Sequence, residues 1–210
     1  MSRTAEQVEE DFERKHGMRF NGWIKQRDKE WLIEFLQSAD VSPIYPISSV
    51  VEIGVFMGST SNIFLYLLPC AYLTGIDDLP CAYLTGIDDW SAGDHQAQPY
   101  FNLLKEGFEK QTGWSGRAEV ITGNSADVGK NWTAPIDILH IDGDHAYGSA
   151  KEDIETFAPW VLSGGYMLID NFDMEGVRQA IDERDWSEWD IIRVPDYKNE
   201  DEKLWAARRK

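Results

Sequence analysis

Basic residues are scarce in this chain of 210 residues. Its 20 lysines and arginines stand against 37 aspartates and glutamates, which gives a formal net charge of −17 and a pI of about 4.5. A charge of this sign repels phosphate at long range, so we expect no nucleic acid and no anionic membrane as a partner. It does not exclude a small anionic ligand held in a local site.

Long apolar runs are missing as well. The longest, residues 63–73, is short and contains Pro69, so no transmembrane helix is expected. The first fifteen residues, MSRTAEQVEEDFERK, are charged and lack the apolar stretch of a secretory signal. A cytoplasmic protein is the default expectation. With 210 residues, of which 42% are hydrophobic, the chain is expected to form one domain with a full core.

Cysteine is limited to two positions, and these are copies of one. Residues 68–78 read LPCAYLTGIDD, and residues 79–89 repeat the same eleven letters, so Cys70 and Cys81 are not an independently placed pair. They predict neither a disulfide nor a metal site. A single tandem copy of this length is also too short to indicate a solenoid.

The most informative stretch is residues 137–171, which reads as strand, helix and strand. The first strand, residues 138–141, ends at Asp142-Gly143-Asp144-His145. An amphipathic helix follows, for which we expect an end at the Ser163-Gly164-Gly165 sequence, and a second strand over 166–169 closes on Asp170-Asn171. A right-handed crossover makes such strands parallel, so Asp142, Asp144, Asp170 and Asn171 are expected at the sheet edge where α/β folds bind ligands.

The remaining chain predicts an α/β protein. Residues 1 to about 45 look helical, with a polar, exposed helix over 4–15 and Asp28 as a cap for a second helix. We interpret residues 1–46 as a helical cap. Strands are expected at 49–53, at 72–77 or its copy 83–88, and at 118–121. Residues 98–110 and 176–183 read as helices, and residues 189–194 and 203–208 as a terminal hairpin.

Three further strand ends carry candidate ligand residues. The first strand runs into Glu52-Ile53-Gly54 and then Gly58, a strand–turn–helix that suits either a ligand loop or a plain turn. The second ends in an acid suited to a ribose diol, Asp88 or its copy Asp77, of which we favour Asp88. The third leads to Asn124-Ser125, either an adenine contact or a polar turn.

Taken in order, the motifs VVEIGVFMGSTS, LTGIDDW, ITGNS, ILHIDGDHAY and VLSGGYMLIDN, with the terminal hairpin, resemble class I S-adenosylmethionine-dependent methyltransferases. Within that class the chain is similar to small-molecule O-methyltransferases of the macrocin O-methyltransferase and cephalosporin-hydroxylase-like group. The resemblance covers residues 47–210. It implies a doubly wound, Rossmann-like, mostly parallel seven-stranded sheet with a C-terminal antiparallel hairpin, in one methyltransferase domain behind the N-terminal cap.

The same resemblance implies residue roles. Glu52, Gly54 and Gly58 frame the methionine end of S-adenosylmethionine, Asp88 or Asp77 holds the ribose, and Asn124 and Ser125 lie near the adenine. Trp90 is a candidate for stacking, and Asp142 also lies at the cofactor. Asp142, Asp170 and Asn171 match an Mg²⁺ site, whose oxygen ligands suit that ion. Asp144 or His145 is then the general base, with Asp144 ranked slightly first.

The expected activity is methyl transfer to a hydroxyl of a small molecule, assisted by Mg²⁺. The sequence is also compatible with a homodimer. Three alternatives stay open. A methyltransferase of the same fold can work without metal. A nicotinamide-dependent oxidoreductase has a similar sheet, although the E-x-G-x-x-x-G spacing and the terminal hairpin speak against it. A non-catalytic cofactor-binding domain is the third.

Overall fold

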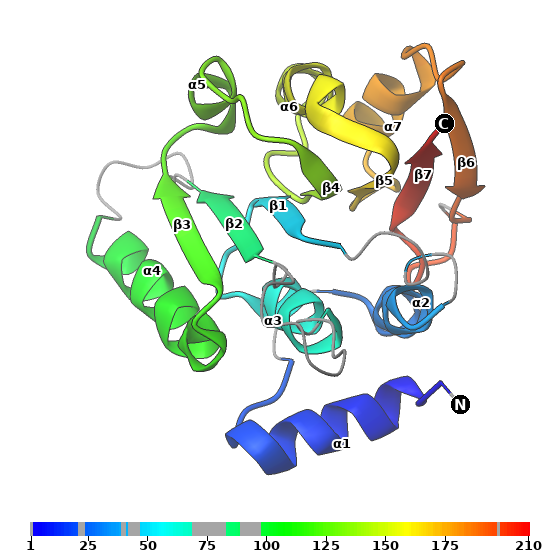
Figure 1. Cartoon of the computed structure of the whole chain (residues 1–210). Coiled ribbons are helices and arrows are strands. Elements are labelled where there is room, and N and C mark those ends of the chain that lie inside the picture. The colour runs from blue at the N-terminus through cyan, green and yellow to red at the C-terminus, as the bar shows by residue number, and fades with distance from the viewer. Residues whose placement is uncertain are drawn as a thin grey trace, which may run out of the picture. The chain divides into compact units, whose positions relative to one another are not determined.

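The structure is a computed structural model that describes residues 2–20, 24–38, 41, 47–68, 83–88, 98–196 and 198–210 (Figure 1). Its helices are α1 (Ala5–His16), α2 (Gln26–Leu36), α3 (Ser59–Leu67), α4 (Gln98–Thr112), α5 (Ser125–Gly129), α6 (Tyr147–Phe157) and α7 (Glu175–Asp182). Its strands are β1 (Ser49–Ile53), β2 (Tyr83–Asp88), β3 (Ala118–Thr122), β4 (Ile136–Ile141), β5 (Val161–Ile169), β6 (Trp189–Arg193) and β7 (Trp205–Arg209).

The strands form one seven-stranded sheet in the order β3-β2-β1-β4-β5-β7-β6. β1 pairs with β4 and β4 with β5 in parallel, whereas β7 is antiparallel to both β5 and β6. The central strands β1, β4 and β5 are apolar runs that are buried on both faces, as a parallel sheet requires. The expectation of an α/β fold with a mostly parallel sheet and a C-terminal antiparallel hairpin is confirmed.

The chain divides into two compact units. The first comprises Met1–Ser48, Val55–Leu84 and Trp90–Glu119, and the second comprises Ser49–Gly54, Thr85–Asp89 and Val120–Lys210. This division follows local contacts and does not test the expected boundary between a cap over residues 1–46 and a domain over 47–210, which stays a prediction.

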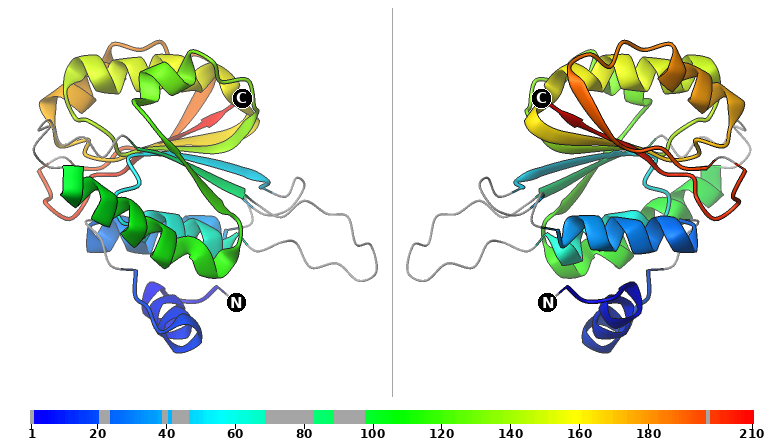
Figure 2. Two further views of the ribbon diagram at one scale, coloured as in Figure 1. Left: turned by 90° about the vertical axis from the view of Figure 1, so that its left-hand side faces the viewer. Right: turned by 90° about the vertical axis from the view of Figure 1, so that its right-hand side faces the viewer.

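The second unit is built around the central strands. Its helices α5, α6 and α7 lie along one face of its strands (Figure 2), and α6 packs against both of the others. Ala150, Ile154 and Phe157 supply the apolar face of α6 and are all buried in the core of this unit. The amphipathic helix predicted from the sequence therefore turns its apolar face toward the core of this unit, as burial of such a helix demands.

The helix in that stretch ends earlier than expected. α6 stops at Phe157, and a short 3₁₀ turn containing Pro159 leads directly into β5. Proline has no N–H to continue the helical ladder, which explains why the apolar pattern outlasts the helix. Gly164 and Gly165 lie inside β5 instead of ending the helix, at a register irregularity against β4, and Gly164 adopts a φ of +85° there.

In the first unit, α2 contacts α1 and α3, and α3 also contacts α4. Helix α1 is not the exposed polar helix expected from sequence, because Ala5, Val8 and Phe12 are buried. The ring of Phe12 contacts four other aromatic rings, from His16, Phe20, Tyr66 and Trp114. Asp28 does not cap α2 either, since that helix begins at Gln26 and Asp28 is buried in its first turn.

The duplicated segment contributes one described strand. β2 is formed by the second copy, so Asp88 is the acid that ends it. Asp77, Cys70 and Cys81 lie outside the described residues, as does Trp90. Among the helices that the structure describes, none combines the length and apolarity needed to cross a membrane.

Candidate cofactor and active site

Three parallel strands of the second unit end level with one another. Ile53, Ile141 and Ile169 are register partners across β1, β4 and β5. The next backbone bonds continue this alignment, because Asp142 N donates to Ile53 O at 2.8 Å and Asp170 N donates to Ile141 O at 2.9 Å. The carboxyl ends of β4 and β5 therefore bring Asp142 and Asp170 to one edge, as the strand pattern predicted.

The neighbouring strands extend this edge. Gly54 N donates to Ile87 O at 2.8 Å, and Gly123 N donates to Asp88 O at 3.1 Å. Asp88 thus lies between the turn that follows β1 and the turn that follows β3. Asn124 accepts a hydrogen bond from Asp127 N at 3.3 Å and caps α5, so its side chain has a structural role as well as the predicted adenine contact.

Gly54 is required by the backbone around it. Its φ is +81°, and a β-carbon at this position would stand 2.0 Å from the carbonyl oxygen of Asp142. The absence of a side chain therefore lets the turn after β1 lie against the turn after β4. This close approach joins two elements that the sequence assigned to the cofactor.

Gly58 belongs to the first unit and has its own reason to be glycine. It precedes α3 with a φ of +81°, and a β-carbon would stand 3.0 Å from the Phe108 ring and 3.1 Å from Thr112 Cγ2. Packing against α4 accounts for this glycine without a ligand. The adjacent Ser59 Oγ is buried and has no hydrogen-bond partner among the described residues, which is the kind of polar atom that a ligand satisfies.

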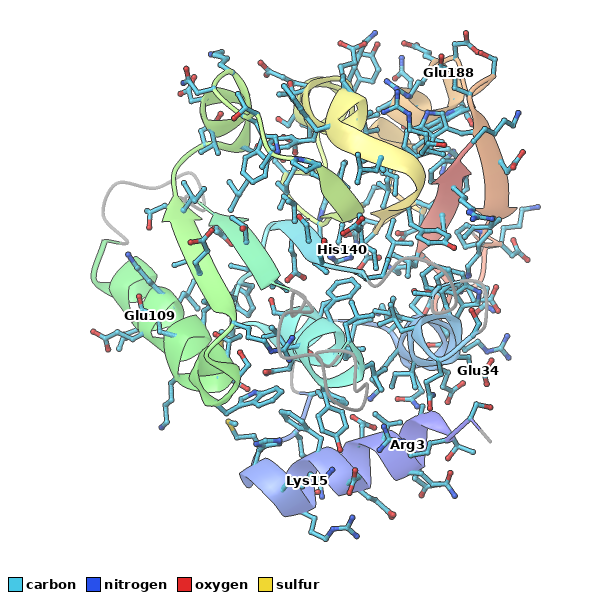
Figure 3. The ribbon with its side chains drawn as sticks, viewed as in Figure 1. Arg3, Lys15, Glu34, Glu109, His140 and Glu188 are labelled. Atoms are coloured by element: carbon cyan, nitrogen blue, oxygen red, sulfur yellow. The ribbon has the colours of Figure 1, made fainter. Side chains whose placement is uncertain are left out.

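Glu52 and His140 form a buried pair that the sequence interpretation missed. They are register partners on β1 and β4, with 3.1 Å between Glu52 Oε1 and His140 Nδ1. Figure 3 labels His140 among the side chains of the central strands. Both residues precede their strand-end turns by the same two positions, Glu52 before Gly54 and His140 before Asp142, and this spacing is the signal that could have paired them.

The two candidate bases, Asp144 and His145, make different contacts in the turn after β4. Asp144 Oδ2 accepts a hydrogen bond from Ser149 Oγ at 2.7 Å and Oδ1 accepts one from Ala146 N at 3.2 Å, and these bonds lower the pKa of Asp144. His145 Nε2 lies 4.0 Å from Asp142 Oδ1. The Asp142 carboxylate raises the pKa of His145 against the effect of its partial burial, with smaller contributions from Asp170 and Asp144.

The turn after β5 is held by its own backbone. Asp170 Oδ1 accepts a hydrogen bond from Asn171 N at 2.6 Å, and Asn171 has a φ of +58°. Asparagine tolerates this left-handed conformation better than most residues. In the part of the chain that the structure describes, no three or more histidine, cysteine, aspartate or glutamate side chains are grouped so as to hold a metal.

Comparison with known proteins agrees with this geometry. Residues 51–172 match a family described as a methyltransferase domain, which is more than half of the chain. The matched range begins in β1 and ends just after β5, so it contains all of the strand ends described above.

Solved structures share the fold at low sequence identity. CalS11, a TDP-rhamnose 3'-O-methyltransferase of calicheamicin biosynthesis, is 15% identical over 88% of this chain and 81% of its own, with a TM-score of 0.57. TomG, an O-methyltransferase from Streptomyces achromogenes, is 17% identical over 79% and 74%, with a TM-score of 0.54. An rRNA methylase from Streptococcus thermophilus is 15% identical over 90% and 99%, with a TM-score of 0.58.

At these identities the solved structures establish the fold and not the methyl acceptor. The family match identifies the chemistry, and the sheet order with its terminal hairpin identifies the architecture. The chain belongs to this methyltransferase-domain family and is a class I S-adenosylmethionine-dependent methyltransferase.

Proposed function

We propose that this chain transfers the methyl group of S-adenosylmethionine to a hydroxyl group of a small molecule. The observation that carries this proposal is the convergence of Asp142, His145 and Asp170 at the carboxyl edge of β4 and β5. An imidazole beside two carboxylates is suited to accept a proton from a hydroxyl as its oxygen becomes a nucleophile. CalS11 and TomG, which are named as O-methyltransferases, share the fold and support this choice of acceptor.

The proposed cofactor residues follow the strand ends. Asp88, which ends β2, is assigned to the ribose, and Asn124 and Ser125 are assigned to the adenine side. Gly54 leaves room beside the Asp142 carbonyl, and Glu52 is fixed beneath it by His140. Gly58 keeps its expected role near the methionine end as a prediction from the resemblance alone. Asp77 and Trp90 also stay predictions.

His145 is the better candidate for the general base. The two hydrogen bonds that Asp144 accepts at the start of α6 lower its pKa and tie its carboxylate to the backbone. The His145 ring is half-buried, and its Nε2 lies 4.0 Å from Asp142 Oδ1. This reverses the order suggested by the sequence, because the ranking now rests on which side chain is already engaged by the helix.

We also propose that Mg²⁺ assists the reaction. Asp142 and Asp170 offer carboxylate oxygens and Asn171 an amide oxygen on adjacent turns, a hard-oxygen set that fits an ion which normally uses one or two protein carboxylates and several waters. Bound there, the ion would supply a positive charge that favours loss of the acceptor's hydroxyl proton. The protein's own contribution is to hold the three oxygens and to place His145 beside them.

In the reaction, bound S-adenosylmethionine supplies an electrophilic methyl group on a positively charged sulfur. The acceptor oxygen forms a bond to that carbon while the carbon–sulfur bond breaks, and the hydroxyl proton passes to His145. Much of the acceleration comes from holding the two reactants in line, since positioning removes the entropy cost of their encounter.

Calorimetric titration with S-adenosylhomocysteine in Mg²⁺ buffer tests the cofactor first. Saturable binding of that ligand and none of NADH is the expected result, and the reverse contradicts the proposal. A panel of catechol and sugar acceptors, assayed with and without EDTA, then tests the acceptor and the metal. Full activity in EDTA would exclude a role for Mg²⁺ and favour the metal-independent methyltransferase. Cofactor binding without transfer to any acceptor would favour a non-catalytic binding domain.

RNA belongs in the same acceptor panel because one structure of this fold is an rRNA methylase. We expect no transfer to RNA, since the net charge of −17 opposes approach to a polyanion. Assembly as a homodimer and a cytoplasmic location also stay predictions from the sequence.

A further inference from the structure

Asp153 is a buried carboxylate that the proposed reaction does not use. It lies on α6, in the second unit, and only 2% of the residue is exposed. Its Oδ1 accepts a hydrogen bond from Ser125 Oγ at 2.5 Å, which joins the middle of α6 to the first residue of α5. A carboxylate that is withdrawn from water in this way is costly, so its presence needs an explanation.

The other oxygen of Asp153 faces a second turn. A β-carbon built on Gly143 would stand 3.3 Å from Asp153 Oδ2 and 3.2 Å from the Ile53 side chain. Gly143 directly follows Asp142, whose carbonyl lies against Gly54. The carboxylate of Asp153 is therefore placed between the turn after β3 and the turn after β4, and the second of these turns contacts the turn after β1.

These turns carry the residues assigned to the cofactor. Ser125 belongs to the adenine-side pair, and Asp142 belongs to both the cofactor and the metal sets. A side chain that bonds one turn and packs on the other fixes their separation. Short-range order of this kind is what a binding site needs from the residues behind it, because every loop ordered beforehand lowers the cost of binding.

We propose that Asp153 is a positioning residue for S-adenosylmethionine, holding Ser125 and the turn after β3 in place against the Asp142-Gly143 turn. The inference rests on the proposed function, since it assumes that the adenine lies beside Ser125. Asp153 acts through these neighbours and does not touch the reacting atoms. A residue of this kind should affect the cofactor's affinity and leave the chemical step largely intact.

The electrostatic setting agrees with this geometry. Burial raises the pKa of Asp153 to about 6, while the bond from Ser125 opposes the rise. The charges that act on it from its own helix and from the preceding loop, Glu152 and Asp144, are both acidic. Neither stabilises its ionised form, so the Ser125 hydroxyl is the group that satisfies the carboxylate among the described residues.

The test compares Asp153→Ala, Asp153→Asn and Ser125→Ala by titration with S-adenosylhomocysteine and by steady-state kinetics. Loss of one hydrogen bond to a charged acceptor corresponds to roughly a tenfold change in affinity. We expect Asp153→Ala and Ser125→Ala each to weaken S-adenosylhomocysteine by about that factor, to raise KM for S-adenosylmethionine, and to change kcat little. Asparagine still accepts the Ser125 bond, so Asp153→Asn should restore most of the affinity.

Glu152→Ala is the matched control, since it removes an exposed acid from the adjacent position of the same helix, and it should leave the affinity unchanged. The double variant Ser125→Ala/Asp153→Ala should cost no more than either single one. Unchanged affinity in folded Asp153→Ala, or equal losses in kcat and affinity, overturns the inference. If Asp153→Ala does not fold, Ser125→Ala and Asp153→Asn still decide it. Failure of the wild-type protein to bind S-adenosylhomocysteine instead contradicts the proposed function.

Discussion

Glu52 and His140 lie side by side on adjacent parallel strands, with their side chains 3.1 Å apart and no more than 2% of either residue exposed. Burial by itself lowers the pKa of His140, but the hydrogen bond and charge of Glu52, with Asp142 and Asp170 beyond it, raise that pKa overall. The pair therefore favours a shared proton in the middle of the sheet, directly beneath the turns that we assign to the cofactor.

Replacing His140 should be costly for this reason. His140→Leu leaves the Glu52 carboxylate buried without its imidazole partner, and breaking such a pair typically costs about 3 to 5 kcal/mol. Urea unfolding at pH 7 measures the loss. The double variant Glu52→Gln/His140→Leu should recover part of it, because no charge is then buried. Equal and additive losses in the two single variants would show that the residues do not act as a pair.

Gly54 should tolerate no side chain. In Gly54→Ala the methyl group meets the Asp142 carbonyl at 2.0 Å and the backbone is held at a φ of +81°, so we expect a loss of roughly 3 kcal/mol or more in the free energy of unfolding. S-adenosylhomocysteine binding should be lost as well. Gly148→Ala is the matched control: nothing lies within 4 Å of its added methyl. It should be neutral, or stabilising by up to about 1 kcal/mol, because alanine favours the helix.

The raised pKa of Asp153 predicts how stability depends on pH. Between the ordinary aspartate value of 3.8 and the folded value of about 6, the folded state holds more protons than the unfolded state. Stability contributed by this residue is therefore present at low pH and declines as the pH rises through that window. The decline amounts to about 3 kcal/mol for a shift of this size. Asp153→Asn does not titrate, so its stability relative to wild type should increase from pH 4 to pH 7.5, as measured by urea unfolding. A constant difference over that range would contradict a raised pKa for the buried Asp153.

The fold was largely predictable because its signals are local. Short apolar strands that end at or just before Gly54, Asp88, Asn124, Asp142 and Asp170 predict the parallel part of the sheet, and the terminal hairpin predicts the antiparallel part. The end of α6 was not predictable from hydrophobic spacing, since Val161 continues the helical pattern into β5. The burial of α1 was missed because it depends on Phe12 meeting rings from distant parts of the sequence.

Within the candidate site, the location of the acidic residues could be predicted from the sequence, but their hydrogen-bond partners could not. The ends of two parallel strands predict that Asp142, Asp170 and Asn171 lie at one edge of the sheet. The sequence does not show that the Asp144 carboxylate accepts hydrogen bonds from Ser149 and Ala146. Asp144 and His145 both follow β4, so their positions in the sequence do not distinguish them as candidate bases. Asp153 could not be predicted for a related reason: it lies on the buried face of α6 with Ala150 and Ile154, where hydrophobic spacing predicts apolar residues and gives no signal for a carboxylate.

The two candidate bases should separate in kinetics. His145→Ala removes the proposed proton acceptor and should lower kcat by roughly 10² to 10⁴, the usual range for general-base catalysis. Asp144→Ala removes two hydrogen bonds at the start of α6 and should cost about 1 kcal/mol of stability with a smaller effect on kcat. Methyl transfer at saturating S-adenosylmethionine measures kcat for both. A larger loss in Asp144→Ala, in protein that remains folded at the assay temperature, would return the role of base to Asp144.

The tandem repeat allows one further prediction about the sheet. α3 ends at Leu67 and β2 begins at Tyr83, so residues 68–82, 15 in all, connect them. Connections of this kind in α/β units usually have about 2 to 6 residues. Because the two copies are identical, deleting either one produces the same chain, in which the same strand sequence follows α3 after four residues, Leu68–Ala71.

We expect the shortened protein to fold with the same sheet order and to bind S-adenosylhomocysteine at least as well as the full chain. The retained copy supplies the same strand sequence and the same terminal acid, and the connection between α3 and β2 has fewer residues. Closing a connection of 4 instead of 15 residues should save about 1 kcal/mol of chain entropy, which should appear as increased stability in urea unfolding. A matched deletion of residues 83–88 alone removes the described strand while leaving the first copy, and binding by that variant would show that the first copy can serve as β2 with Asp77 as its acid. Loss of binding in the shortened protein would mean instead that the eleven additional residues are needed for the site.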